Sequence, residues 1–133
     1  MLKVATRLGT SSVHGIGLFA SQFIPQGTVT WEYDQRFDQV FSLEDLARMS
    51  EFSREQVLHY AYADKKTGGY VLCFDDQRFI NHSRDPRRIN ITSTPDRDTA
   101  ARDITIGEEL FCDYNRFDDT YFERRNIEEG ELL

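Results

Sequence analysis

The stretch FINHS, residues 79–83, places three polar side chains directly behind the apolar pair Phe79 and Ile80. Asparagine is a common turn residue where a chain leaves a buried strand. The histidine that follows is also a frequent metal ligand, and the two side chains together offer hydrogen-bond donors and acceptors. The stretch therefore allows three interpretations: a turn, a metal ligand, or part of a pocket that binds a polar molecule.

Length and composition indicate a single domain over residues 1–133. A chain of this size is too short for two hydrophobic cores, and its 39% hydrophobic residues are enough for one. No apolar run approaches the roughly 18 residues of a membrane helix, and the first residues lack the apolar segment of a secretory signal. We therefore expect an intracellular protein that does not contact a membrane.

The formal net charge is -7 at pH 7. An acidic surface repels a phosphate backbone, and the only compact basic cluster lies at residues 83–88. Direct binding of nucleic acid is therefore not expected. An acidic domain attracts basic partners instead, such as peptides rich in lysine and arginine.

The periodicity of apolar residues predicts short strands around two helices. The first helix is expected at residues 42–50, where Ser42 and Asp45 form a capping-box pattern, and the second at 53–64, starting from Ser53. The predicted strands are residues 3–7, 17–24, 29–34, 70–74, 89–93 and 99–104, with a further strand after the turn at Gly107 and a helical turn in the tail. This pattern is typical of a mostly β or α+β domain.

Three separated stretches are richer in glycine or polar residues than a plain core requires. HGIGLFA (14–20) has two glycines one residue apart, which allow a close backbone approach or a positive φ. FINHS is the second stretch, and GEELFCDY (107–114) is the third. Each pattern alone is weak, since the first also fits a tight turn, but their order and spacing are specific.

Together these motifs resemble the SET-domain family of protein-lysine methyltransferases, over about residues 3–116, with residues 117–133 as a C-terminal tail. The family combines a GxG before an apolar strand, an FxNHSxxP segment and a later GEExxxxY segment. The resemblance implies a SET-domain (β-clip) fold of small curved sheets with a short helical insertion. It also implies that the NHS segment and the segment ending in Tyr114 form a knot-like substructure.

The resemblance implies S-adenosylmethionine as the cofactor and a lysine in a basic, histone-like protein or peptide as the substrate. By position, the family's cofactor-binding residues correspond to His14, Gly15, Ile16, Gly17, Asn81, His82 and Tyr114. Tyr114 would also stand at the methyl-transfer point as the catalytic residue. The compact size resembles that of stand-alone bacterial or viral members, which implies that a homodimer is an option and that a histone substrate would place the protein in a nucleus.

The chemistry of methyl transfer suits these residue types. The lysine must be neutral, although a free lysine has a pKa near 10.4, and an apolar channel disfavours the ammonium form. A tyrosine hydroxyl can align the amine, so no strong general base is needed. Candidates for the channel wall are Tyr62, Tyr70, Phe117 and Tyr121, although packing in the core explains each of these rings as well.

A metal site at His82 is not predicted. His14 and His59 lie far from it in sequence, and neither Cys73 nor Cys112 has a CxxC partner. We therefore expect both cysteines to be buried, reduced thiols.

The sequence departs from the family pattern after the proline, where Arg87 stands in place of the usual asparagine and Asn90 follows three residues later. The cysteine-rich zinc-binding segment of many relatives is also missing. These departures leave open an alternative, a catalytically silent SET-like module that binds a peptide or S-adenosylmethionine. A third interpretation is a relative in fold alone, with an unrelated ligand.

Overall fold

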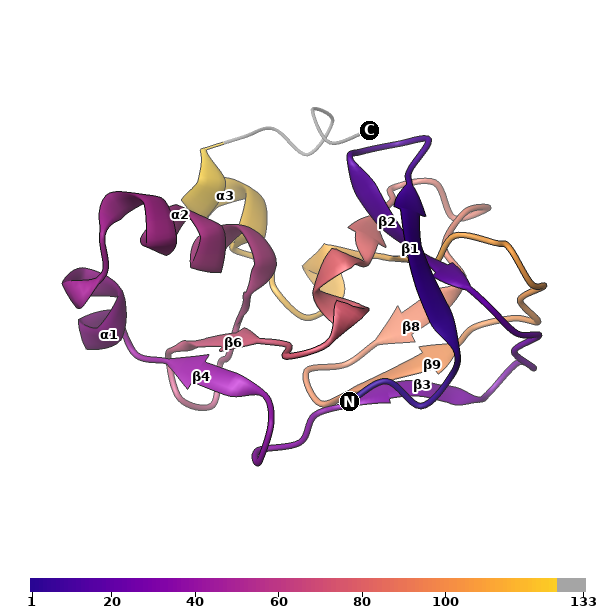
Figure 1. Cartoon of the computed structure of the whole chain (residues 1–133), viewed down its shortest axis with the longest axis horizontal. Helices are drawn as coiled ribbons and strands as arrows, with labels where there is room; N and C mark the ends of the chain where they lie inside the picture. The colour runs from indigo at the N-terminus through magenta and orange to yellow at the C-terminus, as the bar shows by residue number, and fades with distance from the viewer. Residues whose placement is uncertain (127–133) are drawn as a thin grey trace.

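The computed structural model describes residues 1–126, in which short strands form several small sheets (Figure 1). The strands are β1 (Thr6–Thr10), β2 (Ile16–Ala20), β3 (Val29–Glu32), β4 (Gln39–Phe41), β5 (Tyr62–Ala63), β6 (Tyr70–Leu72), β7 (Asn81–His82), β8 (Ile91–Ser93), β9 (Arg97–Ala100) and β10 (Phe111–Cys112). The helices are α1 (Leu43–Arg48), α2 (Glu51–Tyr60) and α3 (Tyr121–Arg125), with two 3-10 turns, η1 (Asp76–Phe79) and η2 (Tyr114–Arg116).

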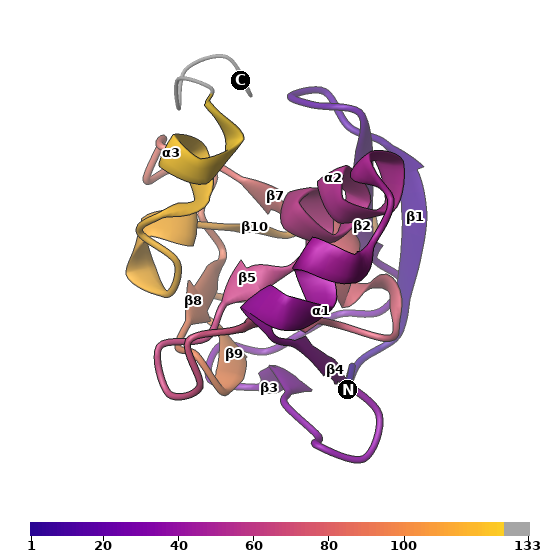
Figure 2. The same cartoon turned by 90° about the vertical axis from the view of Figure 1, so that its left-hand side faces the viewer.

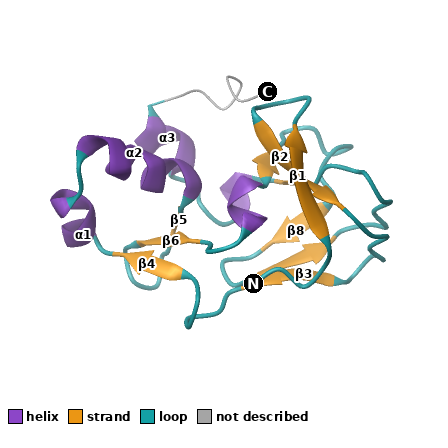
Figure 3. Cartoon of the chain, in the orientation of Figure 1, coloured by secondary structure: helices purple, strands orange, loops and turns teal. Residues whose placement is uncertain are grey.

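Antiparallel pairing dominates the sheets. β1 pairs with β2, β9 lies between β3 and β8, and β6 lies between β4 and β5. The helices gather at one end of the molecule, next to the β4–β6–β5 sheet, while the other sheets occupy the opposite end (Figure 3). The view from the helical end shows α1 and α2 in front (Figure 2). The chain thus has the mostly β architecture, with a helical insertion, that the motifs predicted.

The parallel pair β7–β10 joins the two C-terminal motifs, with Asn81 opposite Phe111 and His82 opposite Cys112. The main hydrophobic core lies around this pair and contains Leu18, Ala20, Ile24, Ile80, Ile91, Ala100, Ile104, Leu110 and Cys112. Because β2, β8 and β9 all contribute to this core, it holds the two strand ends in a fixed position. The side-by-side arrangement expected of the knot-like substructure is therefore confirmed.

The helix predictions are correct in kind and partly wrong in their bounds. α1 has the predicted capping box, because Ser42 accepts from the backbone of Asp45 and the Asp45 carboxylate accepts from the backbone of Ser42. α2 begins at Glu51, two residues before the predicted start, since Ser50 rather than Ser53 caps it. It also ends earlier than predicted, because Tyr62–Ala63 pair with β6.

The strand predictions fail mainly where a local turn takes over. Phe79 belongs to the 3-10 turn η1, because the side chain of Asp75 accepts from the backbone of Gln77 and starts a turn. The strand predicted for residues 3–7 begins only at Thr6. The predicted helical turn of the tail is α3, and the rest of that tail, residues 127–133, lies outside the described residues.

Three further observations concern membrane helices, metal-binding groups and the cysteines. Within residues 1–126, no helix is both long and apolar enough to cross a membrane. In the same part of the chain, no group of three or more histidine, cysteine or acidic residues is arranged to hold a metal ion. Cys73 and Cys112 are buried and not joined in a disulfide.

Candidate functional site

Tyr114 is the second residue after β10 and the first of η2, and hydrogen bonds hold both its backbone and its side chain. Its backbone N–H donates to His82 Nδ1 at 3.0 Å, and its hydroxyl donates to the carbonyl oxygen of Ile80 at 2.5 Å. Burial raises the pKa of the hydroxyl well above its usual value. The phenol is therefore neutral, and because its hydrogen is committed to Ile80, its oxygen can only accept further hydrogen bonds.

Aromatic rings enclose the ring of Tyr114. The centroid distances lie between 4.9 and 6.3 Å, to His82, Phe117, Tyr121 and Phe122. Phe117 directly follows η2, and Tyr121 and Phe122 lie in α3, so the C-terminal part of the described chain forms one side of the site. Such an enclosure excludes water and presents ring faces, which attract cations.

Tyr114 lies in the wall between two cavities. The wide cavity, of about 260 Å³, is bordered by the backbone at residues 14–16, by β7 and by Phe79. The narrow cavity, of about 60 Å³, lies among Trp31, Tyr62, Thr94 and Phe117. Both cavities share the residues His59, Tyr60, Arg78, Ile80, Tyr114 and Tyr121. Beyond the narrow cavity, Tyr62 and Thr94 also border an open surface groove near β4 and β5.

The predicted glycine loop borders the wide cavity through His14, Gly15 and Ile16. The side-chain nitrogen of Asn81 lies 3.0 Å from the carbonyl oxygen of His14 and 3.1 Å from that of Ile16, and donates to this loop. A side chain at Gly17 would meet Glu109, since a Cβ there would lie 2.1 Å from the Glu109 carboxylate. The absence of a side chain at Gly17 leaves room for the Glu109 carboxylate, which accepts from Ser11 and Asn81.

The described geometry gives Asn81 and His82 positioning contacts. Asn81 fastens the glycine loop, and its predicted contact with a cofactor stays a prediction. The His82 side chain is fully buried, and its Nδ1 accepts from Tyr114. An accepting Nδ1 means that the neutral ring carries its hydrogen on Nε2. Both residues border the wide cavity, so the NHS segment is part of a pocket rather than a simple turn.

The channel candidates separate into two groups. Tyr62, Phe117 and Tyr121 line the narrow cavity, where the Tyr62 ring lies edge-on to Phe117 at 5.7 Å. Tyr70 is not among the residues that line it. Tyr70 packs instead against the small cluster under α2, with the guanidinium of Arg124 5.0 Å from its ring centroid.

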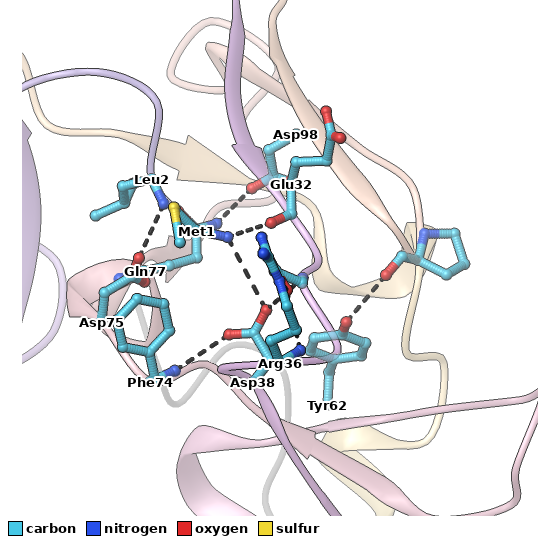
Figure 4. A network of polar contacts seen from close by, with 12 residues as sticks. Met1, Leu2, Glu32, Arg36, Asp38, Tyr62, Phe74, Asp75, Gln77 and Asp98 are labelled. Atoms are coloured by element: carbon cyan, nitrogen blue, oxygen red, sulfur yellow. Dashed lines mark hydrogen bonds and ion pairs between the residues drawn. The ribbon is translucent and has the colours of Figure 1, made fainter.

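Gln77 and Asp98 are site residues that sequence reasoning missed. Both are buried and line the narrow cavity, and Gln77 Nε2 donates to Asp98 Oδ2 at 2.5 Å (Figure 4). Burial raises the pKa of Asp98 to about 6, against the opposing effect of hydrogen bonds from Ser93 and Gln77. The available signal was strand periodicity, because Asp98 lies two residues before the buried Ala100 in β9 and shares its face.

Asn90 has a structural role, a point that the departure from the family pattern after the proline had left open. Its side-chain nitrogen donates to the carbonyl oxygen of Glu109 at 2.8 Å, and its oxygen accepts from the backbone N–H of Phe111 at 2.9 Å. The exposed Arg87 pairs with Asp85 instead. Asn90 therefore holds the strand that leads into Tyr114.

α3 is fastened over the site by an ion pair. Arg124 Nη1 lies 2.6 Å from the carboxylate of Asp118, and its other Nη donates to the carbonyl oxygen of Ala61 at 2.7 Å. Asp118 also accepts from the backbone N–H of Ala63. These contacts link α3 to the end of α2 and to β5, and they bring Tyr121 to the cavity wall.

Residues 15–115 match the SET domain family. No curated protein matches the chain. Similar solved structures include the apo form of Chaetomium thermophilum polycomb repressive complex 2 (PRC2) with two mutations in Ezh2, at a TM-score of 0.68 and 28% identity over 91% of this chain and 16% of that chain. The same complex bound to GSK126 has a TM-score of 0.65 and 27% identity, over 91% of this chain and 17% of that chain. Its autoinhibited apo form has a TM-score of 0.64 and 28% identity, over 92% of this chain and 17% of that chain. The chain thus spans about a sixth of the length of these relatives.

Proposed function

Because this chain belongs to the SET-domain family, we propose that it transfers a methyl group from S-adenosylmethionine to the side-chain amine of a lysine in a protein. The observation that carries this proposal is the position of Tyr114. Tyr114, whose hydroxyl is neutral, lines both the wide and the narrow cavity and so forms part of the wall between them. A cofactor and a lysine that enter from opposite sides would meet at this wall.

The wide cavity fits the cofactor in its chemistry. An adenine ring needs flat apolar faces, which Tyr60 and Phe79 provide, and a charged amino-acid end needs polar partners. Arg78 brings a guanidinium to the same cavity. The loop 14–17 would hold the methionine part, and β7 would lie against the rest of the molecule. When bound, S-adenosylmethionine supplies an electrophilic methyl group on a positively charged sulfur.

The residues of the narrow cavity suit the substrate amine. Aromatic walls from Tyr62, Phe117 and Tyr121 cover the methylene stem of an entering lysine and exclude water from around its amine. The Tyr114 oxygen can accept a hydrogen bond from the neutral amine and align its lone pair. Tyr114 itself does not take up the proton, because its phenol is already protonated.

Two features support an enzyme over a silent binding module. Asn90 holds the strand before Tyr114, so the departure after the proline does not remove this support. α3 closes the aromatic side of the site from within the chain, fastened by the pair of Arg124 and Asp118. The alternative, a silent binding module, was based on the departure after the proline and on the missing zinc-binding segment.

The proposed substrate is a lysine in a basic, histone-like segment of an intracellular protein. The acidic net charge of -7 supports a basic partner. The solved relatives belong to PRC2 assemblies, and this chain covers only a small part of each. The identity of the substrate protein is therefore left to experiment.

The proposal is tested by calorimetric titration with S-adenosylmethionine and, in parallel, with S-adenosylhomocysteine. Binding in the micromolar range is expected, followed by transfer of labelled methyl to a lysine-rich basic peptide but not to the same peptide with arginine in place of lysine. Binding without any transfer would favour the silent module. No binding, even with the lysine-rich peptide present, would refute the cofactor assignment.

A further inference from the structure

A buried carboxylate lines the narrow cavity. Asp98, in β9, is only 4% exposed, and Gln77, which donates to it at 2.5 Å, is 6% exposed. Figure 4 shows the two side chains directed toward each other. A buried carboxylate is costly unless a cation or several donors compensate it. The compensation available to Asp98 therefore decides what the cavity can hold.

Within residues 1–126, no lysine or arginine forms an ion pair with Asp98. The other charged or titratable groups at the cavity are engaged elsewhere. Asp118 is paired with Arg124 at 2.6 Å. Arg78 is exposed, and its guanidinium lies over the ring of Phe79 at 5.4 Å.

Two further groups near Asp98 also fail to neutralise it. Burial and the charge of Arg125 lower the pKa of His59 to about 4, so this ring is neutral at physiological pH. The amino group of Met1 donates to the carbonyl oxygen of Glu32 and lies 3.9 Å from Asp38 (Figure 4). Asp98 is thus the acid of this cavity that has no cation among the described residues.

Trp31 is the neighbour of Asp98 across the β3–β9 pair and lines the same cavity. Trp31 is 3% exposed, and its indole nitrogen is buried and has no hydrogen-bond partner among the described residues. An ammonium group has no acceptor for this N–H, so the indole does not itself bind the cation, but its place beside Asp98 makes it a reporter of what enters the cavity.

We propose that Asp98, oriented by Gln77, is a specificity-determining residue that binds the ammonium group of the target lysine in the narrow cavity. The ammonium has three donors and carries the charge that the carboxylate lacks, while the aromatic walls cover the methylene stem. This inference rests on the proposed function for the identity of the substrate. Capture of the ammonium precedes its deprotonation, so Asp98 acts on substrate affinity more than on the rate of transfer.

The experiment uses n-butylammonium as a mimic of the lysine side chain and n-butanol as its neutral counterpart. Trp31 is the only tryptophan, so its indole N–H gives one NMR signal that reports on the cavity. We expect n-butylammonium to shift this signal saturably at pH 7.5, with n-butanol at least about tenfold weaker. Asp98→Asn should weaken n-butylammonium binding by a similar factor, whereas Asp96→Asn, an exposed acid in the neighbouring groove, should leave it unchanged.

Equal binding of the two probes, no binding of either, or undiminished binding by Asp98→Asn would overturn the inference. The comparison of the probes on the unaltered protein needs no variant, so it decides the question even if Asp98→Asn fails to fold. Failure of the proposed function has a different signature, namely n-butylammonium binding without any methyl transfer. Where transfer occurs, Asp98→Asn should raise the KM for a lysine peptide about tenfold and change kcat much less.

Discussion

The hydroxyl of Tyr114 donates its only hydrogen to Ile80, so toward the narrow cavity it offers lone pairs alone. Such an oxygen can align an amine but cannot protonate it. The variant Tyr114→Phe removes this acceptor and keeps the ring, whose neighbours are His82 and Tyr121. We expect kcat for methyl transfer to fall on the order of 100-fold while the affinity for S-adenosylmethionine changes little.

Single-turnover assays and calorimetry on the same samples separate the two effects. Tyr121→Phe is the matched control, because its hydroxyl donates to the carbonyl oxygen of His59 rather than to Ile80. Equal losses of rate and of cofactor affinity in Tyr114→Phe would contradict the aligning role.

The raised pKa of Asp98, about 6, makes stability depend on pH. A carboxyl whose pKa is higher in the folded than in the unfolded state favours folding below its unfolded pKa, and this contribution is lost as the pH rises through 6. Asp98→Asn cannot ionise and avoids this loss. The free energy of unfolding of Asp98→Asn minus that of wild type should therefore be larger at pH 8 than at pH 4, by up to roughly 3 kcal/mol.

Urea unfolding at a series of pH values checks this prediction. Asp96→Asn again serves as the control, since its carboxylate is exposed and paired with Lys66. A difference between Asp98→Asn and wild type that stays constant from pH 4 to pH 8 would show that Asp98 does not titrate as described.

At the scale of the element, α2 begins at the serine that has the cap geometry. The hydroxyl of Ser50 accepts from the backbone N–H of Ser53, whereas Ser53 lies within the first turn of the helix. Ser50→Ala should lower the free energy of unfolding by about 1 kcal/mol, because an N-terminal N–H loses its partner. Ser53→Ala should be nearly neutral. Thermal unfolding of the two variants compares them directly. A larger loss of stability in Ser53→Ala than in Ser50→Ala would mean that the helix is capped at Ser53, as the sequence predicted.

α3 depends on one buried ion pair for its position. Arg124→Ala would leave the carboxylate of Asp118, which is 1% exposed, without its cation. We expect a loss of about 3–5 kcal/mol in the free energy of unfolding. If the protein stays folded, methyl transfer should fall as well, because Tyr121 and Phe122 from α3 lie against Tyr114.

Asp118→Asn in the Arg124→Ala background measures the coupling between the two side chains. The double variant should be less destabilised than the sum of the single variants, since removing the orphaned charge relieves part of its cost. Additive losses would mean that the ion pair does not fasten α3.

For the molecule as a whole, the net charge of -7 sets a field that a basic substrate would meet. Salt screens such long-range attraction, with a Debye length of about 10 Å at 0.1 M. The kcat/KM for a lysine-rich peptide should therefore fall several-fold between roughly 50 and roughly 300 mM salt. A peptide with the same target lysine but serine in place of the flanking basic residues should show little salt dependence. Equal slopes for both peptides would exclude steering by the overall charge.

The motifs in the chain were enough to predict the family, the mostly β architecture and the place of Tyr114 at the end of the last motif. The sequence also determined the start of α1, because the capping box of Ser42 and Asp45 is a contact between residues three apart. Gly15 belongs to the same class, since its positive φ of 51° is a property of the local backbone. These features follow from residue type and short spacing, which can be read along the chain.

Only the tertiary structure decided which side chains share a cavity. Gln77 and Asp98 are 21 residues apart, and they meet through a side-chain hydrogen bond between η1 and β9. The sequence favoured Tyr62 and Tyr70 equally as channel candidates, yet of the two only Tyr62 lines the narrow cavity. The end of α2 was likewise set by the pairing of β5 with β6 rather than by helix propensity. Burial and contact over long separations depend on the packing of the whole chain, and a carboxylate destined for the interior carries no local mark of it.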